Sequence, residues 1–377
     1  MIAEAQSGFK KTFGYDSSGV WSAPGRANLI GEHTDYNNGF VFPFGIDRRT
    51  YVALSPRQDM LCRVASSLSE DIHEYELSQT KPTQLDWALY PLGVAWTMQA
   101  KAKFGFDAYF VSDVPVGAGL SSSAAIECSI GIALNEIWDA GFSKQEIALL
   151  GQKAENEVVG APTGIMDQTA SMLAKSDAAV LIDCKTLETE LVPLGLSGRG
   201  LVVAVIDTRV SHRHSDGGYR SRREACEKGA EIMGVESLRE LSVADLETAK
   251  QKLDDVVFRR CRHVVTENQR VLEAVKALRQ GEMSQLGELL LQSHASMRDD
   301  FEISIDELDT AVDVAMRVGA IGSRMTGGGF GGAAIAVIDQ NKLENLATEC
   351  KKEFLARGFA EPNIFAVTPS DGARRDS

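Results

Sequence analysis

The chain has 377 residues, of which 44% are hydrophobic and 24% charged, and this composition predicts an ordinary globular protein of about two domains. Its net charge of −14 argues against general binding to nucleic acid or anionic membranes, because both require a basic surface. No apolar run reaches the ~18 residues of a membrane span, and residues 1–11 lack the apolar core of a secretory signal. The six cysteines are scattered without a C-x-x-C pair, so we expect reduced thiols in a cytoplasmic protein.

Along the chain, strand-like and helix-like segments alternate, and a turn-rich stretch at 193–200 is the best linker candidate. Before it we expect strands at 40–42, 50–54, 108–111 and 178–183, and helices at 124–138, 144–158 and 169–174. After it we expect strands at 201–206 and 333–338, and helices at 219–232, 255–279, 283–297 and 306–318. The small, polar tail at 369–377 is expected to fray. The pattern predicts an α+β fold in two lobes, residues 1–190 and 191–377.

A glycine- and serine-rich stretch at 116–124 precedes the helix expected at 124–138. Gly117 and Gly119 would let backbone N–H groups approach an anion, and the start of the helix favours negative charge there. The first serine can cap the helix, and another hydroxyl is free to hold Mg²⁺ on bound phosphates. No lysine follows the glycines, so the stretch is not a Walker loop. The structural alternative is a turn that caps a buried helix.

A dense row of polar groups, Glu32 to Asp35, lies between a glycine and a turn-prone Asn-Asn-Gly. Such a row suits a loop whose carboxylates accept hydrogen bonds from neighbouring hydroxyl groups. A metal site and a capped surface turn are the alternatives, although adjacent residues rarely converge on one ion. Arg26 lies just upstream among apolar residues, where a buried guanidinium would need an anion as its partner.

Asp167 follows an apolar pair and precedes an expected helix. It is either a helix-capping aspartate or an acceptor for a hydroxyl proton during group transfer. A metal site at His212 and His214 is disfavoured, because side chains at i and i+2 point to opposite faces of a strand.

Three motifs together resemble a known family. The stretch G-R-x-N-L-I-G-E-H-x-D-Y at 25–36 resembles the signature of the galactokinase family. The loop at 117–124 and the glycine-rich stretch at 325–332 match two motifs shared by the superfamily of galactokinases and of homoserine, mevalonate and phosphomevalonate kinases. Segments at 217–223 and 293–299 also look like galactokinase segments, and the resemblance extends from about Trp21 to Val367.

The resemblance implies a two-lobed kinase with its active site in the cleft between the lobes. It implies transfer of the γ-phosphoryl group of ATP to the C1 hydroxyl of D-galactose, by a protein for which a monomer is the default expectation. The implied phosphate-binding residues are Gly117, Ala118, Gly119, Leu120, Ser121, Ser122 and Ser123. Ser123 and Glu155 would hold Mg²⁺, and Asp167 and Arg26 would be catalytic. The implied sugar-binding residues are Glu32, His33, Thr34, Asp35 and Tyr219.

Physical chemistry constrains the implied mechanism. Phosphoryl transfer passes through a loose transition state, so positioning and charge stabilisation provide most of the catalysis. The planar, permanently charged side chain of Arg26 suits that task, and it favours the ionised form of an adjacent Asp167. Because a carboxylate is a weak base, we expect proton transfer to come late in the reaction.

Two alternatives to a galactokinase stay open. A kinase for N-acetylgalactosamine or another hexose would share most of the first motif. A non-catalytic sensor of galactose and ATP would act on transcription through a partner protein, and it could tolerate loss of the base or of the phosphate loop. Mevalonate and homoserine kinases are disfavoured because they lack the Glu-His-x-Asp-Tyr stretch.

Overall fold

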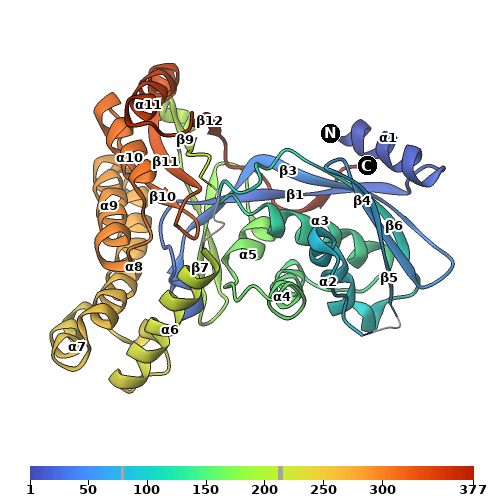
Figure 1. The fold of residues 1–377 in the computed structure, drawn as a ribbon, viewed down its shortest axis with the longest axis horizontal. Coiled ribbons are helices and arrows are strands. Elements are labelled where there is room, and N and C mark those ends of the chain that lie inside the picture. The colour runs from blue at the N-terminus through green and yellow to red at the C-terminus, as the bar shows by residue number, and fades with distance from the viewer. Residues whose placement is uncertain (78–79, 211–214) are drawn as a thin grey trace.

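The computed structural model describes residues 1–77, 80–210 and 215–377. Figure 1 shows two groups of elements side by side, one built mainly from the first half of the chain and the other from the second. Within the described ranges, no helix is long and apolar enough to cross a membrane. The disfavoured metal site at His212 and His214 lies outside the described residues.

A six-stranded sheet forms the centre of the first group, in the order β13-β1-β3-β6-β4-β5. Its strands are β1 (Gly19–Asn28), β3 (Pro43–Pro56), β4 (Leu61–Ser66), β5 (Ser69–Glu76), β6 (Phe106–Ser112) and β13 (Arg374–Arg375). Neighbouring strands are antiparallel, except for the parallel pair β4 and β6.

Helices cover both faces of this sheet (Figure 1). They are α1 (Ile2–Phe13) on one face and α2 (Leu89–Thr97), α3 (Ser122–Ile137), α4 (Lys144–Ala154) and α5 (Met166–Leu173) on the other. Alternating strand residues explain how both faces are filled: Val20 packs with α1, whereas the next residue, Trp21, packs in the cluster that contains α2 and α3.

The second group contains a four-stranded antiparallel sheet, in the order β10-β11-β9-β12. Its strands are β9 (Leu201–Asp207), β10 (Gly322–Thr326), β11 (Ala333–Asp339) and β12 (Asn363–Val367). The helices are α6 (Ser215–Met233), α7 (Leu246–Lys252), α8 (Asp255–Gln280), α9 (Met283–Ser296), α10 (Asp306–Val318) and α11 (Leu343–Arg357). A third sheet consists of β2 (Phe40–Val41), β7 (Ala178–Asp183) and β8 (Thr189–Pro193).

One apolar core joins the two halves of the chain. Phe42 and Phe44 from the first half are fully buried in the same cluster as Val203, Val205 and Val271 from the second. The expected α+β fold and most expected elements are confirmed, and β7 and α10 have the predicted bounds. The division into lobes at residue 190 stays a prediction.

The expectation that the tail at 369–377 frays is wrong. β13 pairs with β1, and the amides of Gly372 and Ala373 donate to the carbonyl oxygens of Ala174 and Ser171. The buried guanidinium of Arg49 donates to the carbonyl oxygens of Asp371, at 2.6 Å, and Gly372, at 3.0 Å. The tail is ordered because its backbone groups have hydrogen-bond partners, although Arg374, Arg375 and Ser377 are exposed.

Replacing Arg49 with Met should lower the free energy of unfolding by about 2–4 kcal/mol, because buried acceptors in the tail and in Ser22 lose their donor. Chemical denaturation monitored by circular dichroism measures the change. The adjacent Arg48→Met is the control, since the Arg48 side chain is 40% exposed and approaches Asp113 only at 4.0 Å. Equal destabilisation by the two changes would contradict this account of the tail.

Candidate active site

Arg26 lies directly after an irregularity in the pairing of β1 with β3. The strand pairing shifts register between Pro24 and Arg26, and the Arg26 amide donates instead to the carbonyl oxygen of Leu120, at 3.0 Å. The side chain is 5% exposed. Its Nε and Nη2 lie 2.8 Å and 2.7 Å from Oδ1 of Asp167, and Nη1 donates to the carbonyl oxygen of Gly119 at 2.5 Å. The expected anion partner of Arg26 is therefore Asp167.

Asp167 lies in the first turn of α5, but it does not cap the helix. The N-cap residue is Ile165, and the carboxylate of Asp167 faces Arg26 and the hydroxyl of Ser121. The expectation that the first serine caps α3 is likewise wrong. Ser121 has a φ of 56° and no capping bond, because its hydroxyl donates to Asp167 instead. Hydroxyl, guanidinium and carboxylate thus meet where three segments converge.

The two glycine-rich stretches approach each other beside this pair. The first, 116–124, runs as a turn up to Ser121, and α3 begins at Ser122, two residues before the expected start at 124. A Cβ on Gly119 would lie 3.2 Å from the carbonyl oxygen of Thr326, and one on Gly327 would lie 3.2 Å from the carbonyl oxygen of Gly119. Both glycines also have positive φ. Glycine is therefore favoured at each position for two reasons, the close contact and the backbone conformation.

A polar inner cavity of about 170 Å³ opens beside Arg26 and Asp167. Four of its lining residues come from the expected sugar-binding set: Glu32, His33, Asp35 and Tyr219. The others are Arg26, Asp167, Met166, Thr163, Gly164, Gly327 and Gly328. The structure thus brings the catalytic candidates and most of the sugar-binding candidates together around one enclosed space.

Asp35 presents a half-buried carboxyl group to this cavity. It packs against Gly164, where even a Cβ would lie 1.9 Å from Oδ2 of Asp35. Burial raises the pKa of Asp35 to about 6, and the negative charge of Asp167 adds to this shift. The carboxyl group can therefore accept hydrogen bonds from hydroxyl groups at neutral pH.

Glu32 lines the cavity, but its carboxylate is held by the protein. It accepts from the amide of Gly327 at 2.7 Å and from the hydroxyl of Thr326 at 3.1 Å, and Nη2 of Arg324 lies 3.3 Å away. The side chain is 1% exposed, and burial raises its pKa above the ordinary value. Glu32 thus joins the acidic loop (residues 32–35) to the second glycine-rich stretch.

His33 and Thr34, which are both expected to bind hydroxyl groups of a sugar, make hydrogen bonds within the protein. Nε2 of His33 donates to the carbonyl oxygen of Gly328 at 3.1 Å, so Nδ1 accepts from the hydroxyl of Tyr36 at 2.8 Å. Burial lowers the pKa of His33 to about 3, so the ring is neutral. Thr34 is fully buried, and its hydroxyl bonds to the carbonyl oxygens of Gly31 and Phe40. Both residues shape the loop, and His33 contributes only its ring to the cavity wall.

A buried charge network beneath the acidic loop was not predicted from the sequence. Arg324, fully buried on β10, contacts Glu32 and lies 4.0 Å from Glu267, which pairs with Arg270 at 2.7 Å. Although burial opposes it, the charges of Arg270 and neighbouring cations lower the pKa of Glu267 to about 2. The sequence shows only an arginine, Arg324, between small residues in the segment that forms β10, and this pattern does not identify the partners of the arginine.

Glu155 lies where α4 changes into a π-helical turn, Glu155–Val159, instead of continuing as expected to residue 158. Such turns often occur at functional sites. The buried carboxyl group accepts from the hydroxyl of Thr163 at 2.9 Å and also bonds to the hydroxyl of Ser123. Burial raises its pKa, and the charge of Asp167 adds to the effect. Such an anion, beside the serine-rich helix start, fits a hard cation, which prefers oxygen ligands.

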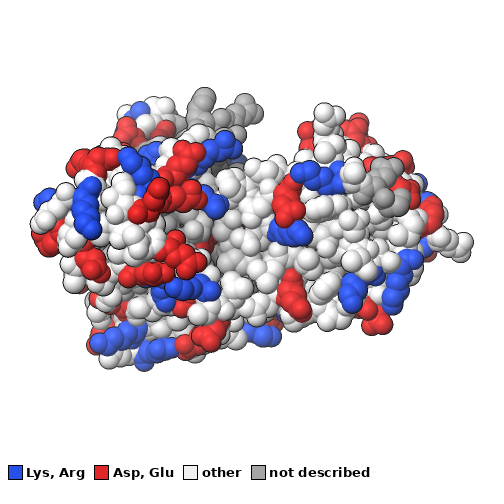
Figure 2. Space-filling view, turned by 90° about the horizontal axis from the view of Figure 1, so that it is seen from below, with Lys and Arg blue, Asp and Glu red and all other residues white. Residues whose placement is uncertain are grey.

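A larger outer cavity of about 600 Å³ adjoins the inner one and has Thr163, Tyr219 and Gly328 in common with it. Its wall also includes Tyr90 and Glu155. Figure 2 shows a hollow between the two halves of the molecule, with charged side chains on either side of a mostly uncharged floor. Among the described residues, no cluster of three or more His, Cys, Asp or Glu could hold a metal ion alone. A cation here would need further ligands from a bound phosphate.

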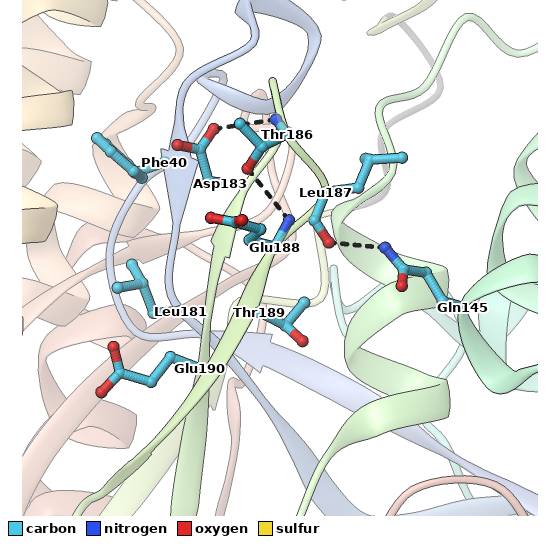
Figure 3. Close-up of a pocket in the computed structure, with 9 residues that line it drawn as sticks. All are labelled: Phe40, Gln145, Leu181, Asp183, Thr186, Leu187, Glu188, Thr189 and Glu190. Atoms are coloured by element: carbon cyan, nitrogen blue, oxygen red, sulfur yellow. Dashed lines mark hydrogen bonds between the residues drawn. The ribbon is translucent and has the colours of Figure 1, made fainter.

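A cavity of similar volume, about 610 Å³, lies at the β7–β8 hairpin and is lined by other residues (Figure 3). Asp183, Glu188 and Glu190 contribute carboxylates to it, and Gln145 donates to the carbonyl oxygen of Leu187. None of the site residues expected from the sequence lines this cavity, so its size does not make it the candidate site.

Comparison with known proteins agrees with this geometry. Residues 7–56 match the galactokinase galactose-binding signature, 90–175 the N-terminal domain of GHMP kinases, and 274–356 their C-terminal domain. A galactokinase of Streptomyces coelicolor is 44% identical over 373 residues, which cover 97% of this chain and 96% of that protein. One of Streptomyces lividans is 41% identical over 373 residues, covering 97% and 94%.

Solved structures agree as well. The galactokinase of Lactococcus lactis, solved in complex with galactose, superposes with a TM-score of 0.93 at 30% identity and covers 99% of both chains. A mevalonate kinase structure superposes with a TM-score of 0.66 at 18% identity, and the match covers 93% of this chain and 98% of the mevalonate kinase chain. At this identity the match shows a shared fold alone. With these motifs, this geometry and relatives aligned over nearly its whole length, the chain belongs to the galactokinase family of ATP-dependent GHMP sugar kinases.

Proposed function

We propose that the chain transfers the γ-phosphoryl group of ATP to the C1 hydroxyl of D-galactose, giving galactose 1-phosphate and ADP. The observation that carries this proposal is the buried pair of Arg26 and Asp167, which lies between the inner cavity and the first glycine-rich stretch. The inner cavity would hold the sugar, and the outer cavity would hold the nucleotide. The galactose in the Lactococcus lactis relative supports this choice of substrate.

In this proposal, Asp35 and Tyr219 face the sugar hydroxyls, while Glu32, His33 and Thr34 hold the acidic loop in shape. Asp167 accepts the proton of the attacking hydroxyl as its oxygen bonds to phosphorus and the bond to the ADP oxygen breaks. Arg26 pairs with the carboxylate of Asp167 and stabilises charge on the transferred group. The pair needs no reorganisation, because folding has already placed it.

The segment from Gly117 to Ser123 would bind the phosphates through backbone N–H groups and hydroxyls at the start of α3. Ser123 and Glu155 would hold Mg²⁺, and when bound this ion would neutralise phosphate charge. We further propose that the protein acts as a monomer in the cytoplasm, in galactose metabolism.

A substrate panel tests the proposed function. ADP release is measured with galactose, galactosamine, N-acetylgalactosamine and glucose, and NMR of the product locates the phosphate. Galactose as the best substrate, phosphorylated at C1, supports the proposal. Preference for N-acetylgalactosamine would establish the alternative hexose kinase, whereas galactose binding without turnover of any sugar would establish the sensor.

Changing Asp167 to Asn should lower kcat by roughly 10²–10⁴-fold, because the amide cannot accept the hydroxyl proton. ATP affinity should stay nearly unchanged, since the substitution preserves volume and leaves an oxygen for Arg26. Steady-state kinetics and nucleotide titration measure the two effects. Asp71→Asn, at an exposed position of β5, is the control. Near-normal kcat in Asp167→Asn would show that the proton leaves by another route.

Galactose binding without nucleotide should weaken about tenfold from pH 7 to pH 5. The pKa of Asp35 is raised to about 6, so the carboxylate that accepts hydroxyl hydrogen bonds becomes protonated as the pH falls through this value. His33 cannot cause the change, since its pKa is lowered to about 3. Calorimetric titration across this range measures the affinity. The inflection should be absent in Asp35→Asn, and its persistence there would assign it to another group.

A further inference from the structure

The side chain of Gln168 connects Glu155 of the candidate cation site to a second buried carboxyl group, that of Glu127. Gln168 is fully buried on α5, directly after Asp167. Its amide nitrogen donates to Oε2 of Glu155 at 2.8 Å and to Oε2 of Glu127 at 2.8 Å. A side-chain amide nitrogen carries two hydrogens, so these two bonds use its full donor capacity.

Glu127 is the second carboxyl group of this cluster. It lies on α3 four residues after Ser123, so the two side chains share one face of that helix. Glu127 is 1% exposed, and no described residue donates to its Oε1. Buried carboxyl groups seldom persist without a role, and neither phosphate binding nor proton transfer uses this one.

The packing around Gln168 restricts its rotamer. α4 passes close to the cluster at Gly151, where a Cβ would lie 3.2 Å from Cγ of Gln168 and 3.6 Å from Cβ of Glu127. The cluster thus joins α3, the end of α4 and α5, which carry Ser123, Glu155 and Asp167.

The chemistry of the amide suits an outer layer around a cation. A lysine or arginine at position 168 would also hold Glu155, but its positive charge would compete with the cation for the carboxylate. A neutral amide orients the carboxylate and leaves its charge available. Glu127 then fixes which end of the amide faces Glu155, because a flipped amide would point its oxygen at both carboxyl groups.

We propose that Gln168 and Glu127 are positioning residues that orient Glu155 toward the nucleotide-bound cation. Because Gln168 adjoins Asp167 on α5, the same amide sets the distance between the base and the cation site. The inference rests on the proposed function, in which Ser123 and Glu155 hold the cation.

The test measures binding of Mn²⁺ to the enzyme saturated with a non-hydrolysable ATP analogue, by electron paramagnetic resonance. Gln168→Met removes both donors at similar volume and should weaken Mn²⁺ binding roughly 10- to 100-fold. Glu127→Leu should weaken it similarly, and Glu127→Gln should restore it, because the new amide still offers an acceptor oxygen to Gln168. The double variant Glu127→Leu/Gln168→Met should bind Mn²⁺ no more weakly than either single variant, since both substitutions remove the same contact.

Galactose affinity without metal separates positioning from folding and should stay close to wild type in Gln168→Met, whereas the thermal midpoint should fall because two buried carboxyl groups lose their donor. Gln145→Met, at an exposed amide on α4, is the matched control. Wild-type Mn²⁺ affinity in Gln168→Met, or an equal loss of Mn²⁺ and galactose binding, would overturn the proposal. Failure of the proposed function would appear separately, as a wild-type protein that phosphorylates no sugar.

Discussion

The architecture of the site depends on neutralising one buried charge. The guanidinium of Arg26 is almost excluded from solvent, and an unpaired charge in that position would cost several kcal/mol. Its partners come from two distant segments, Asp167 on α5 and the carbonyl oxygen of Gly119 in the first glycine-rich stretch. The fold must therefore bring these segments together, and in doing so it places an anionic acceptor beside the expected phosphate position.

A second layer of buried charge gives the acidic loop its shape. Glu32 faces Arg324, which reaches from β10, and Glu267 on α8 accepts from the amide of Gly31. The loop that forms the inner cavity is thus held by elements of the second half of the chain. Three of its polar residues, Glu32, His33 and Thr34, form hydrogen bonds within the protein, and these bonds hold the loop in its shape. Asp35 also lines the inner cavity and is the residue of this loop that we propose to bind the ligand.

The two halves are joined at several independent places. A shared apolar core contains Phe44 and Val203, the glycine-rich stretches touch at Gly119 and Gly327, and the tail returns from β12 to pair with β1. Ser171 on α5 also donates to the carbonyl oxygen of Pro24 on β1. The elements that carry Arg26 and Asp167 are therefore held together by contacts away from the pair itself.

The amino-acid sequence alone predicts the fold class, most helices and strands, the family, and the segments that form the site. These features follow from local periodicity and from contiguous motifs such as the stretch at 25–36, which are written in neighbouring residues. The pairing of Arg26 with an anion was also predictable, because a guanidinium among apolar residues needs one.

Which polar groups face the cavity, and which form hydrogen bonds within the protein, emerges only from the folded chain. Ser121 bonds to Asp167 instead of capping α3, His33 uses both ring nitrogens, and Arg324 and Gln168 acquire roles that no local pattern marks. The order of the tail has the same origin, since Arg49 lies more than 300 positions from the carbonyl oxygens that it holds. Hydrogen bonds of this kind join residues far apart in the chain, so their partners are set by packing in three dimensions and not by spacing along the sequence.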